Sequence, residues 1–170
     1  NLAKSGRSTK TFVKEGLWAK TLAEHPDFVL IQFGHNDSHA KERPESTDAA
    51  TGYRDFLRRY VEEARAGGAT PVLVTPMHRR IFDRDGKVTQ ELLPYADAMK
   101  AVAKEKQVAL VDLHTASGVL FEKFGDAGST DLSCSATDRT HFSEKGAKAM
   151  AALILKGLPV VEPRLSGLLK

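Results

Sequence analysis

The chain lacks the features that mark several classes of protein. Its 170 residues contain one cysteine, Cys134, so no disulfide can form within the chain, and we expect that thiol to be a small buried or half-buried side chain. The most apolar stretch, residues 151–155, falls far short of the ~18 residues that a membrane-spanning helix needs. No dense block of lysine and arginine is present, and the net charge is +3. We therefore expect no membrane partner and no nucleic-acid partner.

The sequence also has little that resembles a metal site. His35 and His39 stand four residues apart with Asp37 between them, which is the nearest approach to a metal motif. A zinc site needs three or four ligands, and no further group of histidines and cysteines supplies them. We therefore expect no metal and no cofactor. A metal-dependent hydrolase that uses this histidine pair stays open as a third class of function.

What remains is the composition of an ordinary globular protein. Hydrophobic residues make up 41% and charged residues 28%, which excludes a disordered or fibrous chain. A length of 170 residues suits one domain with one core, so we predict a single domain over residues 1–170. Pro159 and Pro163 predict an irregular tail over residues 159–170.

Short apolar runs alternate with amphipathic stretches along the chain. Residues 28–32, 72–75 and 108–112 predict buried parallel strands, because they are apolar without alternation and rich in β-branched side chains. Apolar spacings of three and four residues predict helices near 53–64, 92–103 and 147–154, and residues 9–24 are also predicted to be helical. We expect Ser46 or Thr47 to cap the helix near 53–64, and Ser143 to cap the helix near 147–154. The alternation predicts an α/β fold with a parallel sheet and helices on both faces.

Polar segments follow the predicted strands, where parallel sheets place their ligand sites. Residues 33–37 follow the first strand and residues 76–80 follow the second. In the latter segment Arg79 and Arg80 are candidates to bind a uronate carboxylate through paired hydrogen bonds, with a solvated basic loop as the alternative. Residues 125–137 are predicted to be a polar loop that forms the wall of a site.

Asp138 and His141 are spaced for acid–base chemistry. Three residues apart just before a predicted helix, their side chains can point the same way, and a histidine is the natural base near neutral pH. Asn36, in a Gly-x-Asn-Asp turn, and Gly6, in a Ser-Gly-Arg-Ser turn, are candidate hydrogen-bond donors to an oxyanion. Taken singly, each has an ordinary alternative: a surface histidine, an Asx-turn, or a turn before a helix.

The order of these motifs is more specific than any one of them. It runs Asn-x-Ala-x-x-Gly-Arg-Ser (residues 1–8), Phe-Gly-His-Asn-Asp (33–37), then Asp-Arg-Thr-His-Phe (138–142). This order resembles the SGNH (GDSL-type) hydrolase superfamily and, within it, most closely the rhamnogalacturonan acetylesterase family, carbohydrate esterase family 12. Thr75-Pro76, Arg79-Arg80 and Asp85-Gly86 are similar to that family as well.

The resemblance implies a serine esterase on a three-layer αβα, flavodoxin-like fold. It would remove O-acetyl groups from a plant cell-wall polysaccharide such as rhamnogalacturonan through an acyl-enzyme, without a cofactor. Gly6 and Asn36 would donate to the oxyanion, His141 would be the general base, and Asp138 would orient it. His35, Arg79 and Arg80 are candidate substrate-binding residues. The partner would be an acetylated polysaccharide or oligosaccharide, and the resemblance favours a secreted or periplasmic location.

One block of the pattern is not found in these 170 residues. The family's nucleophile belongs to a Gly-Asp-Ser block, and the sequence contains none. We expect this block about 30 to 70 residues upstream of Asn1, a span of one strand–helix–strand unit. The chain would then be an N-terminally truncated esterase, inactive as given, with residues 28–32 as an open sheet edge. The rival hypothesis is a pseudoenzyme or carbohydrate-binding module on the same fold, and the coding sequence before Asn1 separates the two.

Overall fold

The computed structural model describes residues 1–168, and the chain falls into two compact units. The first unit comprises residues 1–76 and 92–110, and the second comprises residues 77–91 and the chain from 111 onward. No helix within residues 1–168 has both the length and the apolar character needed to cross a membrane.

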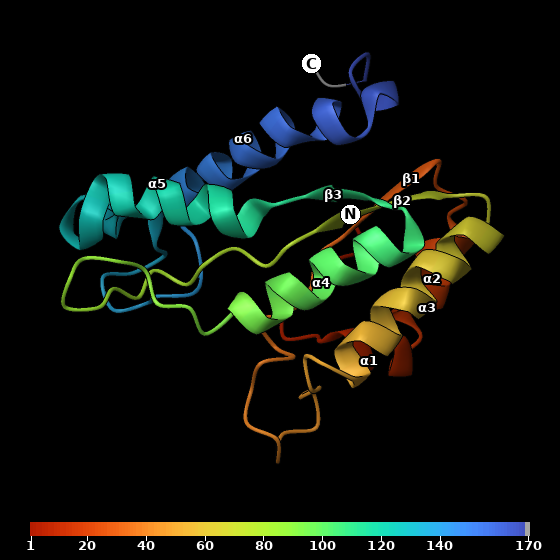
Figure 1. Ribbon diagram of the computed structural model, residues 1–170, viewed down its shortest axis with the longest axis horizontal. Coiled ribbons are helices and arrows are strands. Elements are labelled where there is room, and N and C mark those ends of the chain that lie inside the picture. Colours follow the sequence, from red (N-terminus) through yellow and green to blue (C-terminus); the bar gives the residue numbers. More distant parts are fainter. Residues whose placement is uncertain (169–170) are drawn as a thin grey trace. The chain divides into compact units, whose positions relative to one another are not determined.

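The first unit contains the parallel sheet. Its elements are α1 (Thr9–Lys14), α2 (Leu17–Ala23), β1 (Phe28–Ile31), α3 (Gly52–Ala66), β2 (Thr70–Val74), α4 (Leu93–Lys106) and β3 (Ala109–Val111), which leads into the second unit. The strands lie in the order β1-β2-β3, and β1 pairs in parallel with β2, with Phe28 opposite Thr70 (Figure 1). The predicted α/β fold with a parallel sheet is therefore confirmed.

All four helices of this unit contribute to one hydrophobic core. Helix α3 buries five residues of its apolar stripe and half-buries Phe56, and it packs against α4 and β2 (Figure 1). The chain leaves the helix at Gly67 and Gly68, and Gly68 takes a φ of +84° that favours glycine. Trp18 of α2 is only 3% exposed and donates its ring N–H to Glu63, so it is a core side chain.

Three expectations for this unit need correction. Helix α3 begins after Thr51, not at Ser46 or Thr47, because the Asp48 carboxylate accepts from the N–H groups of residues 50 and 51 and holds a turn there. The segment 9–24 is two helices, since Gly16 has a φ of +71° between α1 and α2. Strand β1 is one of the two edge strands in the described part of the sheet, and Leu30 is 47% exposed, so this strand is not buried on both faces. Its position agrees with the open edge that was expected at residues 28–32.

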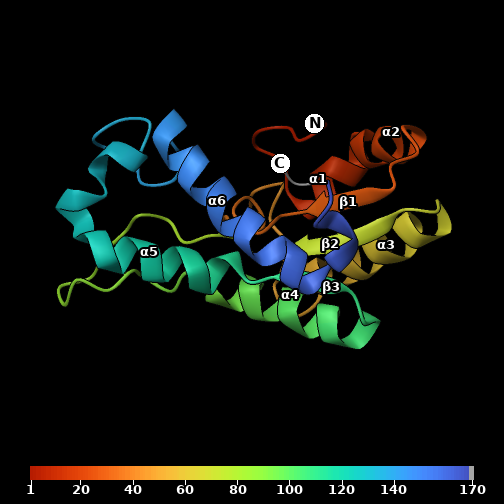
Figure 2. The same cartoon turned by 90° about the horizontal axis from the view of Figure 1, so that it is seen from above.

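The second unit is built from helices and loops. It contains α5 (Leu113–Gly128), a 3₁₀ turn η1 (Thr130–Leu132), α6 (Glu144–Val161) and a second turn η2 (Pro163–Leu165). Helix α6 packs against α5 and both 3₁₀ turns (Figure 2). The N-cap prediction for α6 is confirmed, because the Ser143 hydroxyl accepts from the N–H of Gly146 at 3.1 Å.

Other expectations for this unit are wrong. Helix α5 was not predicted; Asp112 caps it by accepting from the N–H of Thr115, and its helical character extends past the kink at Gly125 into the predicted loop 125–137. Helix α6 continues through Pro159 to Val161 and a 3₁₀ turn follows at 163–165, so the described part of the predicted irregular tail is partly helical. Residues 169–170 of that tail lie outside the described residues. Pro159 removes one helical N–H, and packing against the neighbouring elements outweighs that loss.

Gly146 is a position where the α6 helix start approaches another backbone very closely. A methyl group at this residue would lie 2.0 Å from the carbonyl oxygen of Leu132 and 2.8 Å from the Phe142 ring. No rotamer change relieves a collision with a backbone oxygen, so the segments 130–133 and 142–146 can pack only around a glycine.

We expect Gly146→Ala to lower the free energy of unfolding by about 1–3 kcal/mol, because the crowded backbone must move apart. Urea unfolding followed by circular dichroism measures this change. Gly128→Ala is the matched control, since its added methyl would meet nothing nearer than Phe124 at 3.7 Å. A Gly146→Ala protein as stable as the control variant would contradict the packing described.

Candidate active site

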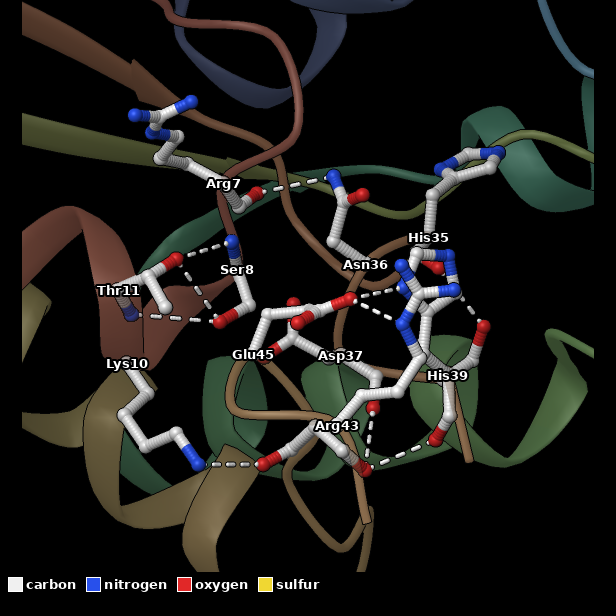
Figure 3. A network of polar contacts seen from close by, with 12 residues as sticks. Arg7, Ser8, Lys10, Thr11, His35, Asn36, Asp37, His39, Arg43 and Glu45 are labelled. Atoms are coloured by element: carbon white, nitrogen blue, oxygen red, sulfur yellow. Dashed lines mark hydrogen bonds and ion pairs between the residues drawn. The ribbon is translucent and has the colours of Figure 1, made fainter. Parts of the chain in front are cut away.

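The first group of candidate residues lies on the loop before α1 and the turn after β1. Ser8 caps α1: its hydroxyl accepts from the N–H of Thr11, and its own N–H donates to the Thr11 hydroxyl (Figure 3). This reciprocal cap fixes where the preceding loop meets the helix. Gly6 in that loop is exposed and has a φ of +76°, and no atom comes within 4 Å of the position of a Cβ. The left-handed backbone at Gly6 is the reason for a glycine there.

A buried carboxylate joins this loop to the turn after β1. Asp37 is fully buried and accepts hydrogen bonds from the N–H of Thr9 (3.1 Å), the hydroxyl of Thr9 (2.5 Å), the hydroxyl of Thr47 (2.8 Å) and the N–H of Gly34 (3.1 Å). Burial raises the pKa of Asp37, and the hydrogen bonds from the two threonines and Gly34 partly oppose that rise. The carboxylate therefore ties three separate segments of the first unit together.

An Asx-turn was the ordinary alternative at this motif, and the wider role of Asp37 was not predicted from the sequence. The bond from the N–H of Gly34, three residues before Asp37, is local, but the bonds from Thr9 and Thr47 come from residues distant in the sequence. The only sign of this role in the sequence was the position of Asp37 directly after Asn36. A charged residue among buried neighbours must find partners, and the threonines are those partners.

Asn36 lies on the same turn and reaches back to the Gly6 loop. Its amide nitrogen donates to the carbonyl oxygen of Arg7 at 3.1 Å (Figure 3). Gly34, two residues earlier, has a φ of +130°, and a methyl there would lie 2.8 Å from the Pro76 ring, so the turn requires glycine. The structure thus brings Asn36 next to the residue that follows Gly6.

The His39 ring contacts a carboxylate. Its Nδ1 lies 2.6 Å from the Glu45 carboxylate, which also pairs with Arg43 at 2.8 Å (Figure 3). Within residues 1–168 no three histidine, cysteine or acidic side chains are grouped so that they could hold a metal ion. His35 is half-buried on the turn beside Asn36.

The second group of candidate residues lies in the loop before α6. Asp138 Oδ1 accepts from the backbone N–H groups of Thr140 and His141, both at 2.7 Å, and Asp138 Oδ2 lies 2.9 Å from His141 Nδ1. The backbone bonds from His141 and Thr140, then the bond from the His141 ring, hold the pKa of Asp138 far below its usual range. An ionised Asp138 can only accept, so His141 Nδ1 donates and Nε2 is left able to take up a proton.

Cys134 and the two arginines differ from their expected positions. Cys134 is exposed, not buried, because it lies on the polar loop, where its thiol donates to Asp138 at 3.3 Å. Arg79 is largely buried and lies 3.8 Å from Glu91. Arg80 is 2% exposed, and its guanidinium donates within the second unit, which argues against its expected contact with a substrate.

The sequence is similar to that of known esterases. The model of the GDSL-like Lipase/Acylhydrolase family matches residues 1–149. Rhamnogalacturonan acetylesterase RhgT of Bacillus subtilis is 40% identical over 93% of this chain and 72% of its own length. The probable rhamnogalacturonan acetylesterase YesY of the same organism is 38% identical over 93% of this chain and 75% of its own length.

Solved structures share the fold. The crystal structure of YxiM from Bacillus subtilis superposes with a TM-score of 0.82 at 25% identity, and this chain covers 44% of it with 93% of its own residues. Axe2, an acetylxylan esterase from Geobacillus stearothermophilus, superposes with a TM-score of 0.72 at 23% identity over 91% of this chain and 68% of its own.

We expect Asp37→Asn to lower the free energy of unfolding by about 2–3 kcal/mol, since an amide nitrogen would face the N–H groups that now donate to the carboxylate. Thermal or urea unfolding measures this. Asp55→Asn is the control, because Asp55 forms an exposed i,i+3 pair with Arg58 and should cost less than about 1 kcal/mol. Equal stability of the two variants would refute the role of Asp37.

Asp138 should make stability depend on pH in acid. Its folded-state pKa lies below the unfolded value of about 3.9, so its contribution is complete above that pH and is lost as the pH falls toward the folded-state pKa. We expect the difference in unfolding free energy between the wild type and Asp138→Asn to be constant above about pH 5 and to narrow below about pH 4. Denaturant titrations across this range measure it, and a difference that does not vary with pH would contradict the bonds to Asp138.

Proposed function

Because this chain belongs to the GDSL-like lipase/acylhydrolase family and so to the carboxylic ester hydrolases, we propose that it removes O-acetyl groups from a plant cell-wall polysaccharide, with rhamnogalacturonan as the first candidate. The similarity to two Bacillus subtilis proteins named as rhamnogalacturonan acetylesterases supports this substrate. The structural observation that carries the proposal is the hydrogen bond between His141 Nδ1 and Asp138.

In this proposal His141 acts as the general base. The ionised Asp138 holds the ring by Nδ1, so Nε2 takes the proton of a serine hydroxyl as the serine attacks the acetyl carbonyl carbon. The same ring then returns that proton to the sugar oxygen as the ester bond breaks and an acetyl-enzyme forms. In the second half of the reaction, His141 takes a proton from water as the water attacks the acetyl carbon of the acetyl-enzyme. The ring then returns the proton to the serine oxygen as acetate leaves.

Gly6 and Asn36 are the proposed donors to the oxyanion. The amide nitrogen of Asn36 carries two hydrogens. One is donated to the Arg7 carbonyl, which orients the amide, and the second hydrogen can be donated to a ligand. The left-handed backbone of Gly6, with no atom near the position of a Cβ, would let a ligand approach its N–H closely. Donors held in advance stabilise the developing negative charge without reorganisation.

The proposed nucleophile is a serine that is not among these 170 residues. Ser8 is spent on the α1 cap, and Ser117 is buried, accepting from the N–H of His78 and donating to the His114 carbonyl. Neither side chain is placed for attack on a polymer. The proposal therefore assigns the nucleophile to the Gly-Asp-Ser block that the motif order leads us to expect.

In the full-length protein we expect His141→Ala to lower the turnover of acetylated rhamnogalacturonan by about 10³-fold or more. Asn36→Ala should lower kcat by about 10²- to 10³-fold with little change in KM, because the amide acts on the transition state. Acetate release measures both. His25→Asn is the control, since asparagine tolerates the left-handed φ of 48° at this exposed loop position.

Two outcomes would overturn the proposal in different ways. A full-length protein that binds the polysaccharide but releases no acetate would favour the non-catalytic carbohydrate-binding alternative. Labelling of Ser5 or Ser8 by a fluorophosphonate in the 170-residue chain, lost on mutation of that serine to alanine, would show that the nucleophile lies within the chain.

A further inference from the structure

We propose that Arg80, held by Asp126, is a positioning residue for the Asp138–His141 pair. This inference rests on the proposed function, because it concerns the base of that reaction. It replaces the earlier expectation that Arg80 binds the substrate, and all the residues that carry it belong to the second unit.

Arg80 is a buried cation whose side chain donates hydrogen bonds to Asp126 and Ser133. Its side chain is 2% exposed, and Nη1 donates to the Asp126 carboxylate at 2.5 Å and to the Asp126 carbonyl at 2.8 Å. Nε donates to the Ser133 hydroxyl at 2.8 Å. A buried guanidinium is tolerated only when it is paired and hydrogen-bonded, so these partners hold the side chain in one orientation.

The backbone of Arg80 also binds the loop that carries Asp138 and His141. The N–H of Arg80 donates to the carbonyl of Arg139 at 2.7 Å, and Arg139 Nη1 lies 3.4 Å from the carbonyl of Arg80. The Arg139 guanidinium also pairs with Asp126. Asp126 thus pairs with both Arg80 and Arg139. Both pairs lower the pKa of its carboxyl, and the bond from Arg139 lowers it most strongly. Arg139 directly follows Asp138, so this contact fixes the chain beside the carboxylate.

The other side of the loop is fixed by Ser133. It forms an isolated antiparallel bridge with Phe142, and the N–H of Cys134 donates to the His141 carbonyl at 3.0 Å. Arg80 therefore contacts the segment 133–142 at two points: its backbone N–H binds Arg139, and its Nε binds Ser133. Loop residues without such supports would place the imidazole loosely, and a displacement of about 1 Å can cost ~10²-fold in rate.

The test uses the full-length protein and 4-nitrophenyl acetate, a small ester without a carboxylate. We expect Arg80→Lys to lower kcat by about 10-fold with KM changed less than 2-fold, because one ammonium cannot reach both Ser133 and Asp126. The kcat of Asp126→Asn should lie between those of Arg80→Lys and the wild type, because the main-chain carbonyl of residue 126 still accepts a hydrogen bond from Arg80. Arg164→Lys is the control: Arg164 pairs with Glu162 at the other end of α6 and should leave kcat unchanged.

A second readout does not depend on activity. In the 170-residue chain, Arg80→Lys should speed the amide hydrogen exchange of peptides that cover 133–142, while peptides within residues 147–158 of α6 keep the wild-type rate. Faster exchange in the loop alone supports the positioning role even if the wild type proves to act on another ester. Wild-type kcat on the small ester combined with a raised KM on a uronate polysaccharide would mean that Arg80 binds substrate, and unchanged exchange in the loop would overturn the proposal.

Discussion

The structure around the candidate site depends on the cost of burying a charge. Asp37 is a carboxylate without access to water, and it is tolerated because Thr9, Thr47 and Gly34 donate to it. Satisfying that one group fixes the start of α1 against the turn after β1. The positions of Gly6 and Asn36 follow, because the former precedes the capped helix and the latter adjoins the carboxylate.

The second unit meets the same constraint with the opposite sign of charge. Arg80 is buried, and its partners Asp126 and Ser133 belong to segments that surround the loop of Asp138 and His141. In both units the residues proposed to act on the ester are half-exposed or exposed, while a fully buried ionic group beside them determines their geometry. This arrangement keeps the reacting groups accessible and restricts their motion.

The predictions from the sequence succeeded where a local pattern determines the structure. The apolar runs predicted at 28–32, 72–75 and 108–112 coincide with strands at 28–31, 70–74 and 109–111, and most of the stripe on α3 is buried. The Ser143 cap was predictable because it needs only the serine hydroxyl and the N–H of Gly146, three residues later. They failed where distant segments decide: Cys134 is exposed because the loop faces solvent, and α6 runs through Pro159 because its packing compensates for the lost hydrogen bond.

By itself the sequence determined the α/β class, the alternation of the three strands with helices and the family to which the chain belongs, because periodicity and motif order depend on neighbouring residues. It named Gly6, Asn36, Asp138 and His141 by motif, but not what holds them. Only the tertiary structure decided that Asp37 and Arg80 are buried and which groups satisfy them. A buried charge takes its partners from segments as far apart as residues 9 and 37 or 80 and 133, and no local pattern records such a pairing.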